Sequence, residues 1–181
     1  KSNRNFKKYS LINVPFSKSR IAFSLIIPNG EFINGGYRTL LKYIDFINKQ
    51  GESVDIYFGE CWNEKELLLN YTPNNHGMPT CLNWYQEDIE YYIEQINKYN
   101  VINVKKNNFY VGLNFQRIYK YGIANAWQTA EGVYKNIEKC ENIMYIIQDR
   151  EYLFYNDERI VNMCKSTYKP EFKYYYISKY L

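Results

Sequence analysis

The chain has 181 residues, of which 46% are apolar and 23% charged, a balance typical of a globular domain and not of a disordered one. The net charge is a mild +4 and no RNP-like or helix-turn-helix pattern is present, so nucleic acid is not an expected partner. No apolar run approaches the roughly 20 residues that cross a bilayer. With no secretory signal and four scattered cysteines, we expect a cytoplasmic protein with reduced thiols. One histidine and the absence of a Cys-x-x-Cys pair disfavour a zinc site.

Residues 1–19 differ from the rest of the chain because they are polar, basic and without apolar periodicity. We interpret them as a loosely held lead-in, followed by one domain at 20–181. A basic arm of this kind is typical of a solvated terminus, and it also suits peripheral contact with the inner face of a membrane. The 21 tyrosines reflect either an AT-rich genome or an aromatic surface for sugars or bases.

The first predicted elements form a strand, a loop, a helix and a second strand. The continuous apolar run at 21–27 predicts a central parallel strand. A loop with three glycines leads to a helix at 37–50, whose apolar residues keep the i, i+3, i+4, i+7 spacing. Gly51 is expected to cap this helix, and residues 53–58 form the next strand. This order is that of a right-handed βαβ unit.

The later elements continue the alternation of strands and helices. Asn83 is expected to cap the first of these helices, and Ile137 to lie on the buried side of the second. The alternation predicts an α/β fold: a Rossmann-like, doubly wound, mostly parallel sheet with helices on both faces. The remaining elements are a helix at 83–99, a strand within 109–118, a strand at 122–126, a helix from 127, a strand at 143–147, a helix capped by Asp157, and a strand at 172–177.

The first candidate site is the glycine loop that precedes the helix at 37–50. Backbone N–H groups at a helix start bind phosphate, and Arg38 in the first turn can pair with an anion. No Gly-Lys-Ser/Thr follows and the G-x-G-x-x-G spacing is missing, which disfavours ATP and NAD chemistry. The alternative is a tight turn beside a solvated arginine.

Two further candidate sites follow predicted strands, where ligands bind in open α/β sheets. Gln148, Asp149 and Glu151 come after the strand at 143–147, and the two carboxylates suit acid–base chemistry or the orientation of sugar hydroxyls. The alternative for Asp149 is a turn former or helix cap. Trp127 suits stacking on a sugar or burial in the core, and Thr129 suits an N-cap. The chain has no Asp-x-Asp motif, which favours metal-free stabilisation of a leaving group.

Three of these segments, at 35–39, 124–130 and 145–155, together resemble a known family. They are similar to the N-terminal domain of bacterial rhamnosyltransferases of the GT-B fold, which build rhamnan and other surface glycans. The resemblance runs from about residue 20 to the end of the sequence. Its most specific part is the third segment, where Gln148-Asp149 stands in place of the His-Asp pair common in the wider group.

The resemblance implies two Rossmann-like domains facing a cleft, of which this chain is the acceptor-side half. The other half would bind a nucleotide-sugar, expected to be dTDP-L-rhamnose, and its absence predicts that the chain alone transfers no sugar. No metal or other cofactor is expected, and the acceptor is a glycan or a lipid-linked glycan. The alternative is a non-catalytic module that binds a glycan or a protein. By this resemblance Gly35 and Gly36 approach the donor diphosphate, and Arg38 matches the family's motif. The resemblance also places Trp127, Gln128, Asp149 and Glu151 on the acceptor side. We take Asp149 and Glu151 as the catalytic candidates, assign Arg38 to the donor-phosphate side, and assign Thr129 and Gln148 to the acceptor side.

Overall fold

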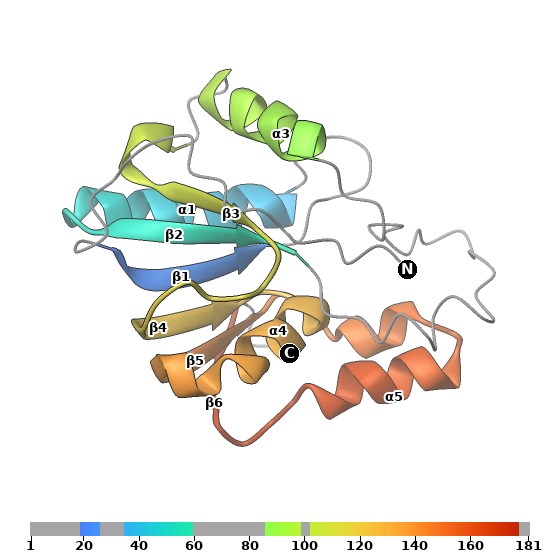
Figure 1. The fold of residues 1–181 in the computed structure, drawn as a ribbon. Coiled ribbons are helices and arrows are strands. Elements are labelled where there is room, and N and C mark those ends of the chain that lie inside the picture. The colour runs from blue at the N-terminus through green and yellow to red at the C-terminus, as the bar shows by residue number, and fades with distance from the viewer. Residues whose placement is uncertain (1–18, 26–34, 60–85, 99–101, 178–181) are drawn as a thin grey trace, which may run out of the picture.

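The computed structural model describes residues 19–25, 35–59, 86–98 and 102–177 of the chain. Six strands form one sheet in the order β3-β2-β1-β4-β5-β6, and all neighbouring strands are parallel (Figure 1). This order is that of a doubly wound, Rossmann-like sheet, so the predicted fold class is confirmed. The strands are β1 Ser19–Leu25, β2 Ser53–Phe58, β3 Asn108–Val111, β4 Tyr119–Ala124, β5 Cys140–Ile147 and β6 Phe172–Tyr176.

Helices cover both faces of the sheet because alternate side chains of each strand point to opposite faces. On β2, Val54, Ile56 and Phe58 join a core with helices α1 and α3, whereas Tyr57 joins a second core with α4. Helix α5 packs against the start of α4, with the short helix η4 nearby. The helices are α1 Gly35–Lys49, α3 Gln86–Lys98, α4 Trp127–Lys135 and α5 Glu158–Ser166, and the 3₁₀ helices are η2 Val104–Lys106, η3 Ile137–Lys139 and η4 Glu151–Phe154.

The first βαβ unit agrees closely with its prediction. Strand β2 has the predicted bounds, and α1 begins two residues earlier than predicted. Gly51 ends α1 with a φ of 86°, a left-handed conformation that glycine adopts at little cost, and its N–H donates to the Asn48 carbonyl at 3.1 Å. Local signals were therefore sufficient here. Asn83 and most of the predicted lead-in, residues 1–18, lie outside the described residues, as do the last two residues of the predicted first strand.

Strands β4 and β5 begin three residues earlier than predicted. Their amino-terminal halves contain polar residues and break the apolar runs, yet they pair with each other through Tyr119 with Cys140 and Tyr121 with Asn142. Pairing with a neighbour extends both strands beyond what their own hydrophobicity indicates. Strand β4 also ends two residues earlier than predicted, where the chain turns toward α4.

The prediction that Ile137 lies on the buried side of α4 is wrong. Helix α4 ends at Lys135, and Ile137 lies in η3 with 38% of its surface exposed. Asn136 ends the helix because its side-chain amide donates to the carbonyls of Leu113 and Gly132, at 2.7 and 2.8 Å. This asparagine joins the helix end to the segment before β4, a contact that helical periodicity does not reveal.

The segment from 112 to 118, which connects β3 to β4, lies over the second core without a helix of its own. Leu113 and Phe115 pack there beside Tyr57 and Val133. Gly132 makes this possible, since a Cβ atom at that position would come within 2.2 Å of the Leu113 side chain. The crossover therefore depends on close contact between α4 and an extended chain.

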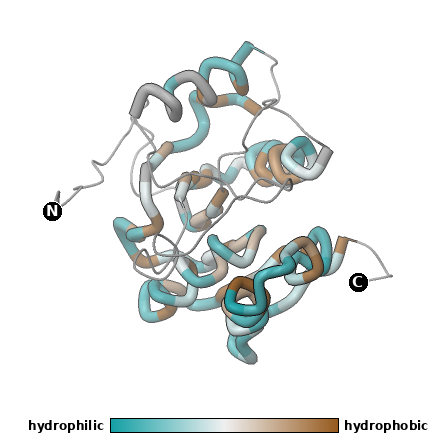
Figure 2. The backbone as a smooth tube through the Cα atoms, turned by 90° about the vertical axis from the view of Figure 1, so that its right-hand side faces the viewer, coloured by the Kyte–Doolittle hydropathy of each residue, from teal (hydrophilic) through white to brown (hydrophobic). Residues whose placement is uncertain are grey.

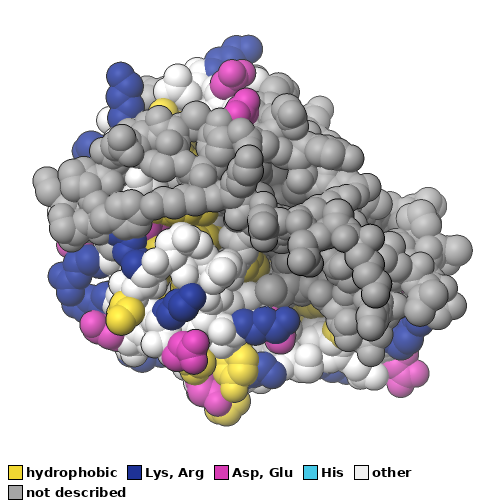
Figure 3. Space-filling view, viewed as in Figure 1, with side chains coloured by type: hydrophobic (Ala, Val, Ile, Leu, Met, Phe, Trp, Pro, Cys, Tyr) yellow, Lys and Arg dark blue, Asp and Glu magenta, His cyan; other side chains and the backbone are white. Residues whose placement is uncertain are grey.

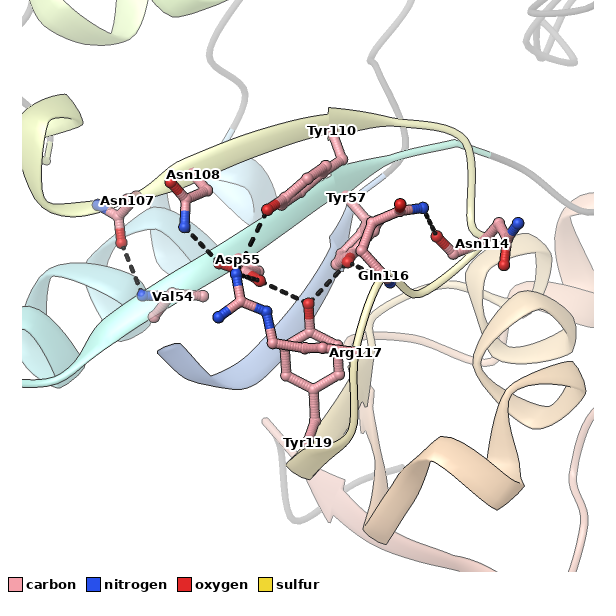
Figure 4. Close-up of polar contacts among 10 residues, drawn as sticks. All are labelled: Val54, Asp55, Tyr57, Asn107, Asn108, Tyr110, Asn114, Gln116, Arg117 and Tyr119. Carbon is pink, nitrogen blue, oxygen red and sulfur yellow. Dashed lines mark hydrogen bonds and ion pairs between the residues drawn. The ribbon is translucent and has the colours of Figure 1, made fainter. Parts of the chain in front are cut away.

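A buried polar network also holds this crossover to the sheet (Figure 4). Asp55 of β2 is fully buried, and one of its oxygens lies 3.0 Å from the Arg117 guanidinium. The Tyr119 hydroxyl donates to the same oxygen at 2.5 Å, and the Asn108 amide donates to the other oxygen at 2.7 Å. A buried charge requires this pairing and hydrogen bonding. The network lies toward the amino ends of the strands, away from the edge at which ligands bind in such sheets.

Candidate functional site

The strand order reverses between β1 and β4, and this point defines the candidate site. From β1 the chain passes to α1 on one face of the sheet, and from its neighbour β4 it passes to α4 on the other face. Ligands of open α/β sheets bind at the carboxyl edge beside such a switch point. Figure 2 looks toward the side of the molecule where the strands of Figure 1 end. The predicted site segments begin at this edge, after β1, β4 and β5.

The glycine segment forms the start of α1. Gly35 and Gly36 are its first two residues, so their N–H groups have no carbonyl partner within the helix. Tyr37 is buried in the first core, whereas Arg38 is exposed. The tyrosine therefore anchors the turn, and the arginine side chain is accessible to a ligand or to solvent. Gly30 and the rest of the loop lie outside the described residues.

Thr129 lies inside α4 and not at its N-cap, so that part of the prediction is wrong. The N-cap position is Ala126, which has no polar side chain. Thr129 replaces the missing cap from within the first turn, where its hydroxyl oxygen accepts from the N–H groups of Asn125 and Ala126, both at 3.0 Å. The buried threonine thus closes the turn between β4 and α4, and this structural role accounts for its contacts.

Trp127 is a core residue. Its side chain is 2% exposed and packs against Ile160 and Cys164 of α5. Its indole N–H donates to the Tyr155 hydroxyl at 3.2 Å, and the two rings meet edge to face. Of the two interpretations of this tryptophan, the structure favours burial, and a sugar could stack on the ring only if α5 moved. Trp127 nevertheless contributes to the site through its backbone N–H.

Gln128 is the second residue of α4 and is 3% exposed. Among the residues that the structure describes, its buried side-chain carbonyl oxygen has no hydrogen-bond partner, and the same holds for the buried Ser24 hydroxyl near the end of β1. Ser24 alternates with Phe23 and Leu25 of the first core and so belongs to the α4 face of the sheet. An unpaired buried acceptor costs about 1–3 kcal/mol. Among the described residues, buried polar atoms without a hydrogen-bond partner thus occur near the end of β1 and at the start of α4, on either side of the switch point.

Glu151 links the third predicted segment to the start of α4. Its Oε2 atom accepts from the Trp127 backbone N–H at 2.8 Å and from the Tyr145 hydroxyl at 2.7 Å. Burial raises the pKa of this carboxyl to about 7; the two hydrogen bonds act in the opposite direction, and the charge of Asp149 adds to the increase. A carboxyl that titrates near neutral pH can both give and take a proton at physiological pH.

The other residues of this segment are more open to solvent. Asp149 is exposed, and its carboxylate accepts from the Arg150 N–H at 2.7 Å, the contact of a turn former. Gln148 is half-buried directly after β5. Asp149 is close enough to Glu151 for its charge to raise the pKa of the Glu151 carboxyl. The two catalytic candidates therefore interact electrostatically, although Asp149 is exposed and Glu151 is half-buried.

The structure therefore brings most of the predicted residues together at one edge. Trp127 and Glu151 are in direct contact, and Gln128 and Thr129 share the first turn of α4. The glycine segment and Arg38 begin the helix on the opposite face of the same edge. Sequence reasoning missed Tyr145, which resembled an apolar residue of a buried strand. Its hydroxyl could have indicated a role at the site, because a buried tyrosine hydroxyl needs a hydrogen-bond partner.

The comparisons with known proteins add no relative. No protein-family model matches the chain, and searches of curated proteins and of solved structures found no significant match. Among the described residues, no group of His, Cys, Asp and Glu side chains could hold a metal ion, and no helix is long and apolar enough to cross a membrane.

Proposed function

We propose that this chain is the acceptor-side domain of a GT-B glycosyltransferase that transfers a deoxyhexose such as rhamnose to a glycan. The three segments that resemble bacterial rhamnosyltransferases begin at the carboxyl edge of a doubly wound sheet, beside its switch point. The observation that carries the proposal is Glu151, a half-buried carboxyl at this edge whose pKa is raised to about 7. Acid–base chemistry on a sugar hydroxyl uses such a group.

In the proposed reaction the acceptor hydroxyl oxygen forms a bond to C1 of the donor sugar. The bond from C1 to the diphosphate oxygen breaks, and its electron pair leaves with the nucleoside diphosphate. The proton of the acceptor hydroxyl passes to the Glu151 carboxylate, and exposed Asp149 helps to hold the acceptor. Gln128 and Gln148 supply further polar groups to the acceptor side.

The donor phosphates would meet the chain at the start of α1. Gly35 and Gly36 supply N–H groups at the positive end of a 15-residue helix, and exposed Arg38 adds a full positive charge. These groups stabilise a leaving diphosphate without a metal ion. The donor, dTDP-L-rhamnose, would be held mainly by the partner domain of the GT-B pair.

A lipid-linked acceptor is favoured by the surface of η4. Leu153 and Phe154 lie two and three residues after Glu151, and 65% and 48% of their surfaces are exposed. Large exposed apolar side chains beside a site suit an apolar ligand or a membrane surface. We therefore include a lipid carrier in the proposed acceptor.

The test is transfer of labelled rhamnose from dTDP-L-rhamnose to a rhamnose-containing glycan by the native protein joined to its donor-binding domain. Glu151→Gln is expected to lower the rate by about 10²–10⁴, since it removes a proton acceptor. Glu158→Gln, at the exposed start of α5, is the matched control and is expected to keep the rate. Equal rates for both variants would refute the role of Glu151. Glycan binding without any transfer would support the binding module instead.

A further inference from the structure

Tyr145 is a fully buried residue of β5 whose ring is held by other aromatic rings. The ring centroids of Tyr168 and Phe172 each lie 5.7 Å away, and that of Tyr174 lies 6.1 Å away. A ring packed in this way has little freedom to turn. Its hydroxyl therefore has a fixed position, from which it donates to Glu151 Oε2 at 2.7 Å.

The two carboxyl oxygens of Glu151 differ in their hydrogen bonding. Oε2 receives both donors, the Tyr145 hydroxyl and the Trp127 N–H. Oε1 takes part in none of the hydrogen bonds found among the described residues, and it is not one of the buried polar atoms that lack a partner. Oε1 is therefore the oxygen that solvent reaches. Since a hydroxyl and an amide already point at Oε2, a proton bound by this carboxyl belongs on Oε1.

We propose that Tyr145 is a positioning residue for Glu151: its hydroxyl fixes Oε2 and leaves Oε1 as the oxygen that exchanges a proton with the substrate. This inference rests on the proposed function of Glu151 as the proton acceptor. Tyr145 acts only through the carboxyl and touches no substrate. The Trp127 N–H supplies the second fixed donor, so the orientation of the carboxyl depends on β5 and α4 together.

The titratable groups that face this carboxyl come from β5, from α5 and from the segments that follow these two elements. Tyr145 belongs to β5 and Asp149 follows it, Cys164 belongs to α5, and Tyr168 follows α5. Burial raises the pKa of the Cys164 thiol to about 12 and that of Tyr145 well above its ordinary value, and the pKa of Tyr168 is raised in the same direction. These three groups stay neutral at physiological pH. Asp149 acts on Glu151 through its charge and raises the pKa of that carboxyl.

The experiment is a pH titration of the Glu151 carboxyl carbon by NMR in the 181-residue chain. Tyr145→Phe removes the hydroxyl and keeps the ring, so the ionised carboxylate loses one donor and its pKa is expected to increase by about one pH unit. Tyr174→Phe is the matched control, because its hydroxyl donates to the Lys169 carbonyl and not to a carboxylate. The control is expected to leave the pKa of Glu151 unchanged.

A second measurement needs no variant. The Trp127 amide proton, which donates to Oε2, is expected to shift with pH at the same midpoint as the Glu151 carboxyl carbon. The inference would be overturned if the titration midpoint of Glu151 were unchanged in Tyr145→Phe. It would also be overturned if the chemical shift of the Trp127 amide proton did not change with pH as Glu151 titrates. Both measurements are made without sugar. If the pKa of Glu151 increased in Tyr145→Phe but the protein joined to its donor-binding domain transferred no sugar, the proposed function would be rejected. If that protein transferred sugar but the midpoint of the Glu151 titration stayed unchanged in Tyr145→Phe, this inference would be rejected.

Discussion

Replacement of Arg117 by Gln removes the cation that neutralises the buried carboxylate of Asp55. The guanidinium lies 3.0 Å from the carboxylate, and the two side chains are 13% and 0% exposed. In the variant Asp55 keeps the Tyr119 hydroxyl and the Asn108 amide as donors, but it loses its counter-charge. The β3–β4 crossover should therefore become the weakest part of the fold.

The expected loss of stability is about 3 kcal/mol. Removal of one partner of a buried ion pair costs roughly 3–5 kcal/mol, and the two remaining donors to Asp55 place this case at the lower end. A domain of this size is stable by about 5–15 kcal/mol, so the loss should be readily measured. Asp55→Asn combined with Arg117→Gln leaves no unpaired charge, and the double variant should cost about 2 kcal/mol less than the sum of the singles.

The assay is urea unfolding followed by circular dichroism. Arg159→Gln is the control, because Arg159 pairs with Asp157 at 2.6 Å on the surface, where the two side chains are 56% and 30% exposed. Such a pair is worth about 0–1 kcal/mol. If Arg117→Gln cost no more than Arg159→Gln, or if the two changes at the buried pair were additive, the reasoning about buried charge would be refuted.

Three further predictions concern the site and its support. Burial raises the pKa of Glu151 from 4.5 to about 7, so between these pH values the folded chain binds a proton that the unfolded chain has lost. The free energy of unfolding should therefore fall by roughly 3 kcal/mol as the pH rises from about 4.5 to about 7. In Glu151→Gln, urea unfolding at a series of pH values should not show this fall. Gly132→Ala should destabilise the fold by about 1–3 kcal/mol despite the better helix propensity of alanine, because the new Cβ meets Leu113, and a thermal melt equal to wild type would contradict this. Leu153→Ser with Phe154→Ser should reduce transfer to a lipid-linked acceptor several-fold and spare a water-soluble one, and equal losses on both acceptors would exclude a lipid contact at η4.

Much of the sheet could be predicted from short stretches of sequence. The strand at 53–58 combines β-branched and aromatic residues with burial on both faces, and Gly51 before it supplies the left-handed turn that ends α1. The interaction that decides each of these features lies within a few residues along the chain. The alternation of such elements is sufficient to predict a doubly wound fold, since parallel strands need crossover connections.

Predictions failed where a distant contact decides the outcome. Ile137 follows the helical spacing, but Asn136 ends α4 by donating to Leu113, 23 residues away. Thr129 is a typical N-cap residue, yet the chain places it in the first turn of α4, where it replaces the cap that Ala126 lacks. In both places tertiary packing determines which backbone groups the polar side chains of Asn136 and Thr129 meet.

The sequence by itself determined the order of the elements and the polar residues that follow each strand, because these depend on local hydrophobicity and turn chemistry. Only the tertiary structure decided that Trp127 is buried and that Glu151 meets both Trp127 and Tyr145. It also placed Arg117 beside Asp55, 62 positions apart in sequence number. A pKa depends on burial and on neighbouring charges, and both arise only when segments distant in sequence pack together.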